Sequence, residues 1–222
     1  MLISVGHFSG RGLFKWIAGF AAIGLVFFSY DQFWPAPDLG PPKIISRAEW
    51  GAEQADPRLE PDQDPEVFNT VVVHHSAMLL SEGPRDIQSV HMHQRGFLDI
   101  GYHFVIDGEG RIYEGRSLAT HGAHVAGHNA GTLGIALMGN YEIIEPATEQ
   151  RVRLKWLIQA LMRKYPLTHL AGHGDFAPGK TLCPGKNLEA LLPTLAKELG
   201  LKFGVGGYVG PEPGAPALNP AL

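Results

Sequence analysis

The chain has 222 residues, of which 45% are hydrophobic and 18% are charged, and its formal net charge is −4 at pH 7. This length suits one core-forming domain with appendages better than two domains, and the slightly acidic balance excludes a basic nucleic-acid-binding protein. Eleven histidines and a single cysteine are the unusual features of the composition.

An apolar run of 18 residues, 13–30, lies near the N-terminus, with Arg11 before it and Asp31 after it. Its length is within the range that spans a bilayer, and the basic flank predicts a cytoplasmic N-terminus. Small residues typical of a cleavage site do not follow the run. We therefore expect residues 1–30 to be a cytoplasmic tip and a single-pass anchor in the inner membrane, with the remaining chain in the periplasm. A buried core helix is the alternative.

Two segments without periodicity flank the central part of the chain. Residues 31–43 are a proline-rich linker, and residues 204–222 form a Gly/Pro-rich tail that we expect to be disordered. The predicted folded domain is therefore 44–203.

The first half of this domain alternates strand and helix patterns. The β-branched run 70–76 predicts a buried strand that ends in histidines, and 84–95 begins with proline and an early aspartate, as helices often do. Residues 102–107 and 111–114 flank a Gly-containing turn and predict a hairpin. A second buried strand is expected at 133–139.

Two helical patterns follow in the second half. Residues 148–165 carry leucines at helical spacing up to Pro166, and 188–199 repeat this pattern around Pro193, which predicts a kink or a restart. Alternating strands and helices predict an α/β fold, and the hairpin makes its sheet mixed.

Cys183 needs an explanation, because an unpaired thiol outside the cytoplasm is open to oxidation. One interpretation is an inert buried cysteine. Zinc is the other, since it binds thiolate and imidazole, and His173 lies in the same loop. Either His74 or His75 can complete the set, but not both, because neighbouring strand residues face opposite sides. Three protein ligands leave a fourth position open, as in catalytic zinc sites.

The chain resembles the peptidoglycan recognition proteins and the related zinc N-acetylmuramoyl-L-alanine amidases, including the phage lysozyme-type amidases. The resemblance covers roughly residues 44–200 and implies a central mixed β-sheet flanked by helices. The motifs that carry it occur in this order: "IISRAEWGA", "VVVHHSA", "IQSVHMHQRGFLDIGYHFVID", "YEGR", "GAHVAGHNAGTLGIALMGNY" and "GHGDFAPGKTLCPG".

The resemblance implies a role for particular residues. The first histidine of the strand-end pair, His74, would bind zinc together with His173 and Cys183. Tyr102 matches a catalytic tyrosine, and Thr181 matches a catalytic position two residues before the third ligand. An extended loop would also place Thr181, rather than Lys180, on the side of Cys183.

Some positions depart from the cytosolic recycling amidases, whose loop length this chain shares. Those amidases have a lysine at the position of Thr181 and a catalytic glutamate where this chain has Ala136, so the proton carrier stays open. Three further residues are candidates for binding substrate: His103, Arg116 and His124.

Together these patterns predict a membrane-anchored, periplasm-facing zinc hydrolase that cleaves the amide between N-acetylmuramic acid and L-alanine. Its partner would be peptidoglycan or released muropeptides. The alternative is a non-catalytic peptidoglycan receptor on the same fold, and retention of Cys183 favours the enzyme. A structural zinc module is disfavoured by the open fourth position.

Overall fold

The computed structural model describes residues 40–62 and 67–208. The predicted anchor (1–30), most of the linker (31–43) and the tail from residue 209 onward lie outside these ranges. Within the described residues, no helix has the length and apolar character needed to cross a bilayer.

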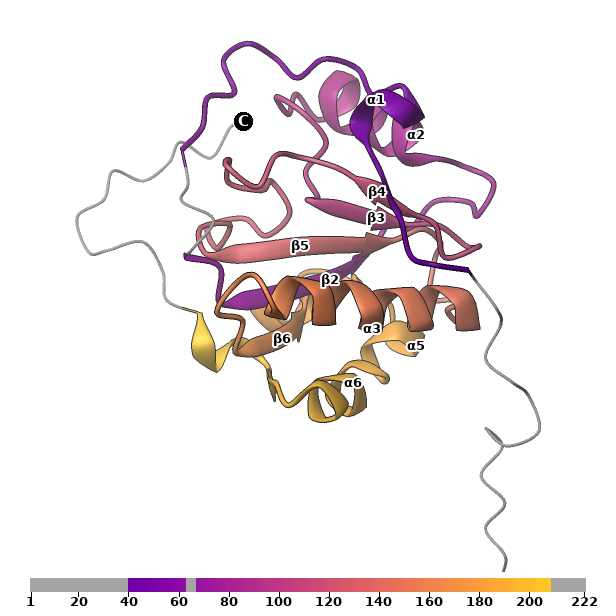
Figure 1. Ribbon diagram of the computed structural model, residues 1–222, viewed down its shortest axis with the longest axis vertical. Helices are drawn as coiled ribbons and strands as arrows, with labels where there is room; N and C mark the ends of the chain where they lie inside the picture. The colour runs from indigo at the N-terminus through magenta and orange to yellow at the C-terminus, as the bar shows by residue number, and fades with distance from the viewer. Residues whose placement is uncertain (1–39, 63–66, 209–222) are drawn as a thin grey trace, which may run out of the picture. The chain divides into compact units, whose positions relative to one another are not determined.

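A seven-stranded mixed sheet forms the centre of the fold (Figure 1). Strands β3 and β4 pair antiparallel, whereas the other neighbouring strands pair parallel. The mixed sheet and its hairpin are therefore confirmed. In spatial order the strands are β1 (Ile44–Ile45), β4 (Ile112–Glu114), β3 (Phe104–Ile106), β5 (Thr132–Leu137), β2 (Thr70–His75), β6 (His169–Gly172) and β7 (Lys202–Phe203).

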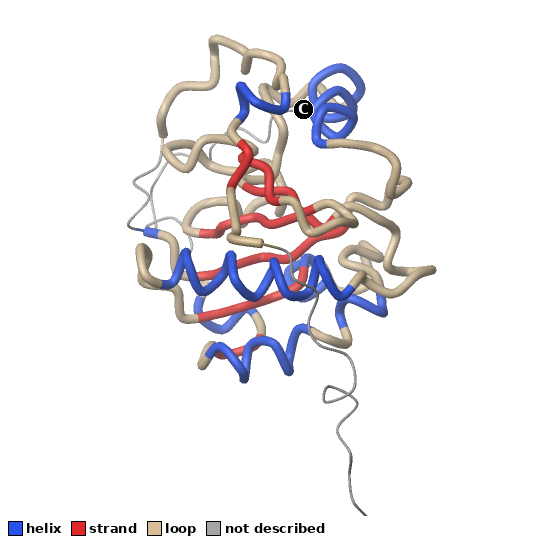
Figure 2. The backbone as a smooth tube through the Cα atoms, turned by 45° about the vertical axis from the view of Figure 1, so that its right-hand side comes forward, coloured by secondary structure: helices blue, strands red, loops and turns tan. Residues whose placement is uncertain are grey.

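Helices cover both faces of the sheet (Figures 1 and 2). The long helix α3 (Thr148–Met162) packs with α6 (Leu192–Leu199) on one face. Helix α2 (Pro84–Ser89) covers part of the other face and continues directly into a π-helical segment, η3 (Val90–Gln94). The shorter helices are α1 (Arg47–Trp50), α4 (His173–Phe176), α5 (Lys186–Glu189) and η4 (Val205–Gly207).

The alternation of side chains along the strands creates two apolar layers. On β5, Leu133, Ile135 and Leu137 point into the larger core under α3 and α6. Ala136 and the following Met138 point the other way, into a smaller core against α2. A strand that is buried on both faces has a continuous run of apolar residues in its sequence. This is why the sequence of 133–139 predicts a buried strand.

The predicted elements at 70–76, 84–95 and 148–165 are confirmed in type. The pattern at 188–199 is divided between α5 and α6, because Pro193 occupies the first turn of α6, where a missing N–H is tolerated. Strand β6 was not predicted. Its four residues, HLAG, are too short and too poor in β-branched side chains to show a strand pattern.

Candidate functional site

The pairing of β2 with β6 brings two histidines together at the carboxyl ends of these strands. Val73 of β2 lies opposite Gly172, the last residue of β6, in this parallel ladder. His74 and His173 are the residues that follow this pair in the sequence. Their ring centroids are 4.8 Å apart. The carboxyl ends of parallel strands are where open α/β sheets place their ligands.

Cys183 joins this pair from the loop after α4. Its Sγ lies 3.5 Å from Nδ1 of His74, and one ligand atom each from His74, His173 and Cys183 lie within 4.8 Å of one another. Tetrahedral zinc, with bonds of about 2.05 Å to nitrogen and about 2.3 Å to sulfur, separates such ligands by about 3.5 Å. The donor types and the His74–Cys183 spacing therefore fit zinc.

His75 points away from this cluster, because successive side chains of a strand face opposite sides and its neighbour His74 faces the cluster. The Nδ1 of His75 accepts a hydrogen bond from the Tyr141 N–H at 3.3 Å. Its own backbone N–H donates to Cys183 Sγ at 3.4 Å. Of the two histidines that the sequence left open, His74 is the one in the cluster, and His75 supports the thiol through its backbone.

The loop that carries Cys183 lies between two turns, closed by the hydrogen bonds from the Lys180 N–H to the Ala177 carbonyl and from the Gly185 N–H to the Leu182 carbonyl. Lys180 and Leu182 are exposed while Thr181 and Cys183 are half-buried. The Oγ1 of Thr181 accepts a hydrogen bond from the Cys183 N–H at 3.1 Å. Thr181 is therefore in direct contact with Cys183, whereas the catalytic role of Thr181 stays a prediction.

Gly185 closes the loop against the residues that follow β5. Its φ is +87°, and a Cβ at this position would lie 2.4 Å from the carbonyl carbon of Tyr141. Only glycine satisfies both the left-handed backbone and this close approach. The loop is thus clamped directly after Cys183.

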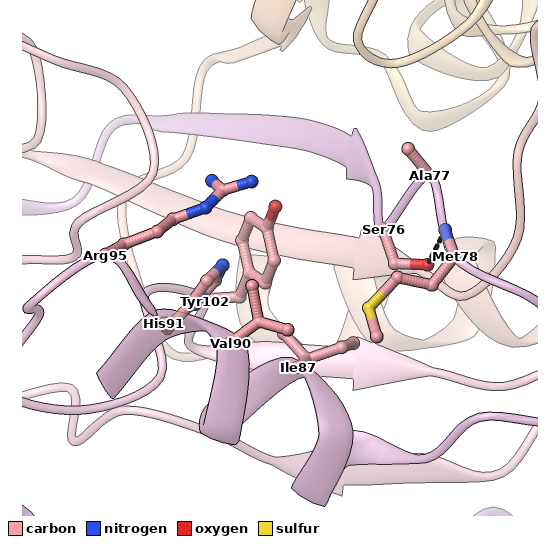
Figure 3. A pocket seen from close by; sticks show the side chains of 8 residues that line it. All are labelled: Ser76, Ala77, Met78, Ile87, Val90, His91, Arg95 and Tyr102. Carbon is pink, nitrogen blue, oxygen red and sulfur yellow. Dashed lines mark hydrogen bonds between the residues drawn. The ribbon is translucent and has the colours of Figure 1, made fainter. Parts of the chain in front are cut away.

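Tyr102 borders both the cluster and a cavity of about 240 Å³. Its ring centroid is 5.0 Å from that of His74. In Figure 3 the Tyr102 hydroxyl and the Arg95 guanidinium both lie on the side of the lining away from the helix that carries Ile87, Val90 and His91. The lining side chains come from the end of β2, from α2 and η3, and from Tyr102: Ser76, Ala77, Met78, Ile87, Val90, His91, Arg95 and Tyr102.

His91 is a cavity residue to which the sequence analysis gave no role. Its Nδ1 accepts the Gly101 N–H at 2.9 Å, and its ring lies 5.3 Å from that of Tyr102. The spacing of Ile87, Val90, His91 and Arg95 could have indicated that His91 lines the cavity, since these positions share one face of a helix.

Residues 63–186, which include the whole cluster and Tyr102, match the family model described as N-acetylmuramoyl-L-alanine amidase. The chain belongs to this family.

Similar proteins of this family include both recognition proteins and amidases. Peptidoglycan-recognition protein SD of Drosophila melanogaster is 33% identical over 159 residues, which cover 67% of this chain and 83% of that protein. The structure of the amidase LysC from Clostridium intestinale has a TM-score of 0.61 and 33% identity, covering 73% of this chain and 100% of that one. Human PGRP-IBETAC, in complex with glycosamyl muramyl pentapeptide, has a TM-score of 0.62 and 30% identity over 69% of this chain and 96% of its own.

Burial determines the protonation of the histidines in this amidase-family site. It holds the pKa of His74 and of His124 well below the ordinary value, with neighbouring imidazoles adding to the effect, and it lowers the pKa of His173. These imidazoles are therefore neutral at pH 7, which is the form that binds a metal.

Burial acts in the opposite direction on the two acids of the site. It raises the pKa of Cys183 to about 12, against the hydrogen bond from the His75 N–H. A bound cation is what would convert this thiol to a thiolate. Burial, followed by the charge of Cys183, also raises the pKa of Tyr102, so its phenol remains a hydrogen-bond donor.

Of the three predicted substrate-binding residues, only His124 contacts the cluster. Its Nδ1 lies 3.0 Å from Nε2 of His74. His103 is buried, with its Nδ1 accepting the Gly134 N–H at 3.0 Å. The Arg116 guanidinium is also buried and donates to the carbonyls of Ile100, Asp99 and His121 at 2.8–3.1 Å. Substrate contacts for these residues stay predictions.

The buried histidines predict an acid-sensitive fold. Burial lowers the pKa of His91 and of His103 to about 4, from an ordinary 6.5. The unfolded chain therefore takes up these protons first as the pH falls below 6.5, and stability is lost between pH 6.5 and about 4. Each histidine should reduce the free energy of unfolding by about 1.4 kcal/mol per pH unit in this window.

Urea unfolding of the full chain at pH 7, 6 and 5, with a chelator present, measures this slope. His91→Asn and His103→Asn should each flatten it by about 1.4 kcal/mol per pH unit. An unchanged slope in both variants would show that these imidazoles are not held neutral by burial.

Proposed function

We propose that the chain is a zinc-dependent N-acetylmuramoyl-L-alanine amidase. The observation that carries the proposal is the convergence of His74, His173 and Cys183 beside Tyr102 and a cavity. Zinc held by these three residues would supply a Lewis acid for the scissile carbonyl and would acidify water.

The chain's own residues would position the reacting groups. Hydrolysis adds water to the carbonyl carbon of the muramic acid lactyl group and breaks the C–N bond. The lactyl group becomes a carboxylate, and the stem peptide leaves with a free amine on its L-alanine that carries a proton from the water. Tyr102, as a protonated phenol, can donate a hydrogen bond to the carbonyl oxygen. Thr181 Oγ1 already accepts the Cys183 N–H, so its own O–H is oriented by the loop and can act as a second donor.

The comparisons support peptidoglycan or its fragments as the substrate class. LysC is named as an N-acetylmuramoyl-L-alanine amidase, and human PGRP-IBETAC was solved with a muramyl pentapeptide. A cavity of about 240 Å³ next to the metal ligands, with His91 and Arg95 in an otherwise largely apolar lining, suits a short peptide that carries carbonyl and carboxylate groups.

A non-catalytic peptidoglycan receptor is the second candidate, and the similarity to peptidoglycan-recognition protein SD favours it. A receptor needs the cavity but no metal ligand. The joint presence of two histidines, one cysteine and a buried tyrosine at one point favours the enzyme.

The purified full chain, incubated with purified sacculi, should release peptides that begin with a free L-alanine amine and should leave the glycan strands intact. Cys183→Ser keeps the size of the side chain but removes the thiolate. It should therefore lose both the bound zinc and the release of peptide, and mass analysis of the soluble products together with zinc determination measures both.

Each outcome separates the candidates. Binding to sacculi without release of peptide, with zinc present, would support the receptor instead. Equal zinc content in the wild type and in Cys183→Ser would refute the assignment of the third ligand.

The loop before Cys183 offers a matched pair of variants. Thr181→Ala should reduce the rate about ten- to a hundredfold, because it removes a donor worth about 1–3 kcal/mol in the transition state. Lys180→Ala alters an exposed side chain of the same loop and should leave the rate within about twofold. Steady-state rates at equal zinc content test this, and the opposite ranking of the two variants would contradict the role of Thr181.

We also propose that residues 13–30 anchor the chain in the inner membrane, with the amidase domain in the periplasm. The support is the spanning-length apolar run, its basic flank and the lack of a cleavage motif after it. N-terminal sequencing of the mature protein tests this, since a start near residue 37 would make the protein soluble in the periplasm.

A further inference from the structure

We propose that His124 is a positioning residue for the metal site, which accepts the Nε2–H of His74 and so orients the Nδ1 lone pair of His74 toward the metal. This inference rests on the proposed zinc site. It assigns His124 a role through His74, rather than the contact with substrate that the sequence indicated.

A metal on Nδ1 of His74 would allow only one arrangement of protons between the two rings. Nδ1 of His74 faces Cys183 Sγ at 3.5 Å, and its Nε2 faces Nδ1 of His124 at 3.0 Å. A metal on Nδ1 leaves the proton on Nε2 of His74, so Nδ1 of His124 must be the acceptor. The rings are nearly perpendicular, at 83°, which brings the His74 N–H toward the edge nitrogen of His124.

The second nitrogen of His124 is enclosed in the protein interior. Once Nδ1 accepts, the proton of His124 is on Nε2, which is buried, and the backbone of Thr132 is the other hydrogen-bonding group beside this imidazole. The side-chain hydrogen-bond contact of the ring is the one between Nδ1 and His74, at 3.0 Å.

Two glycines form the slot that holds the His124 ring. A Cβ on Gly122 would lie 2.3 Å from Cδ2 of His124, and a Cβ on Gly134 would lie 2.5 Å from the same atom. The Oδ1 of Asn129 accepts the backbone N–H of His124 at 3.0 Å and that of Val125 at 2.9 Å. Backbone from β5 and from the loop before it thus fixes where the ring lies.

The burial of His124 favours a role through His74 over a direct contact with substrate. The whole residue is 7% exposed and its Nε2 is enclosed, so the ring offers the solvent little surface. Metal-bound histidines commonly donate their second N–H to a carboxylate, a backbone carbonyl or a water, and loss of that acceptor typically weakens metal affinity by about 10- to 100-fold. Here the imidazole of His124 would take the place of that acceptor.

The test compares variants that separate the acceptor from the volume of the ring. His124→Asn keeps an oxygen near the position of Nδ1, whereas His124→Phe and His124→Leu fill the slot without an acceptor. In the full chain, competition with a chelator should show zinc affinity within about threefold of wild type for Asn, and about 10- to 100-fold weaker for Phe and Leu. Thermal unfolding of the metal-free proteins identifies which variants fold.

Zinc affinity is measured without turnover, so it is independent of the amidase activity. Wild-type zinc affinity in either folded apolar variant would overturn the role of His124. So would an Asn variant as weak as the apolar ones, because packing would then be the cause. A wild type that binds zinc but leaves sacculi uncut would refute the proposed enzyme and still allow this test, whereas a wild type that binds no zinc would refute both.

Discussion

The parallel register between β2 and β6 is the constraint on which the site depends. Because Val73 lies opposite Gly172, His74 and His173 leave the sheet side by side. A slip of one residue in β2 would turn His74 to the opposite face and bring His75 to the cluster face. The core resists such a slip, since Val71 and Val73 would lose their places in the apolar layer under α3. The same burial that stabilises the sheet therefore aligns His74 with His173.

Burial also connects the stability of the domain with its chemistry. Several imidazoles are held neutral inside the fold, which suits metal binding but makes the fold sensitive to acid. The buried thiol is costly to ionise in the absence of a cation, and a divalent ion reverses that balance. The fold itself thus brings His74, His173 and Cys183 together, with Tyr102 kept as a neutral donor at the edge of the cavity.

Sequence patterns predicted the parts of the site that depend on local chemistry. The sequence alone indicates zinc, because Cys183 and His173 lie in one loop and two histidines lie at the end of a predicted strand. The choice between His74 and His75 needed the resemblance, because alternation along a strand does not say which face holds the ligand. The restart at Pro193 and the hairpin at 102–114 followed from the special backbone properties of proline and glycine.

Contacts between segments that lie far apart in the chain could not be predicted in this way. The hydrogen bond between His74 and His124 joins positions 50 residues apart, and it depends on the glycine slot around His124. The sequence also gave no sign that backbone carbonyls from two separate segments accept hydrogen bonds from the guanidinium of Arg116. Strand β6 was missed because its pairing with β2, and not its own short sequence, makes it a strand.

In the proposed site, one thiolate and two imidazoles hold a zinc ion with a position left open. Zinc K-edge X-ray absorption of the full chain measures this most directly. We expect one sulfur at about 2.3 Å, two imidazole nitrogens at about 2.0–2.1 Å and one further light atom around the zinc. A zinc shell without sulfur, or one with a third imidazole in place of the light atom, would contradict it.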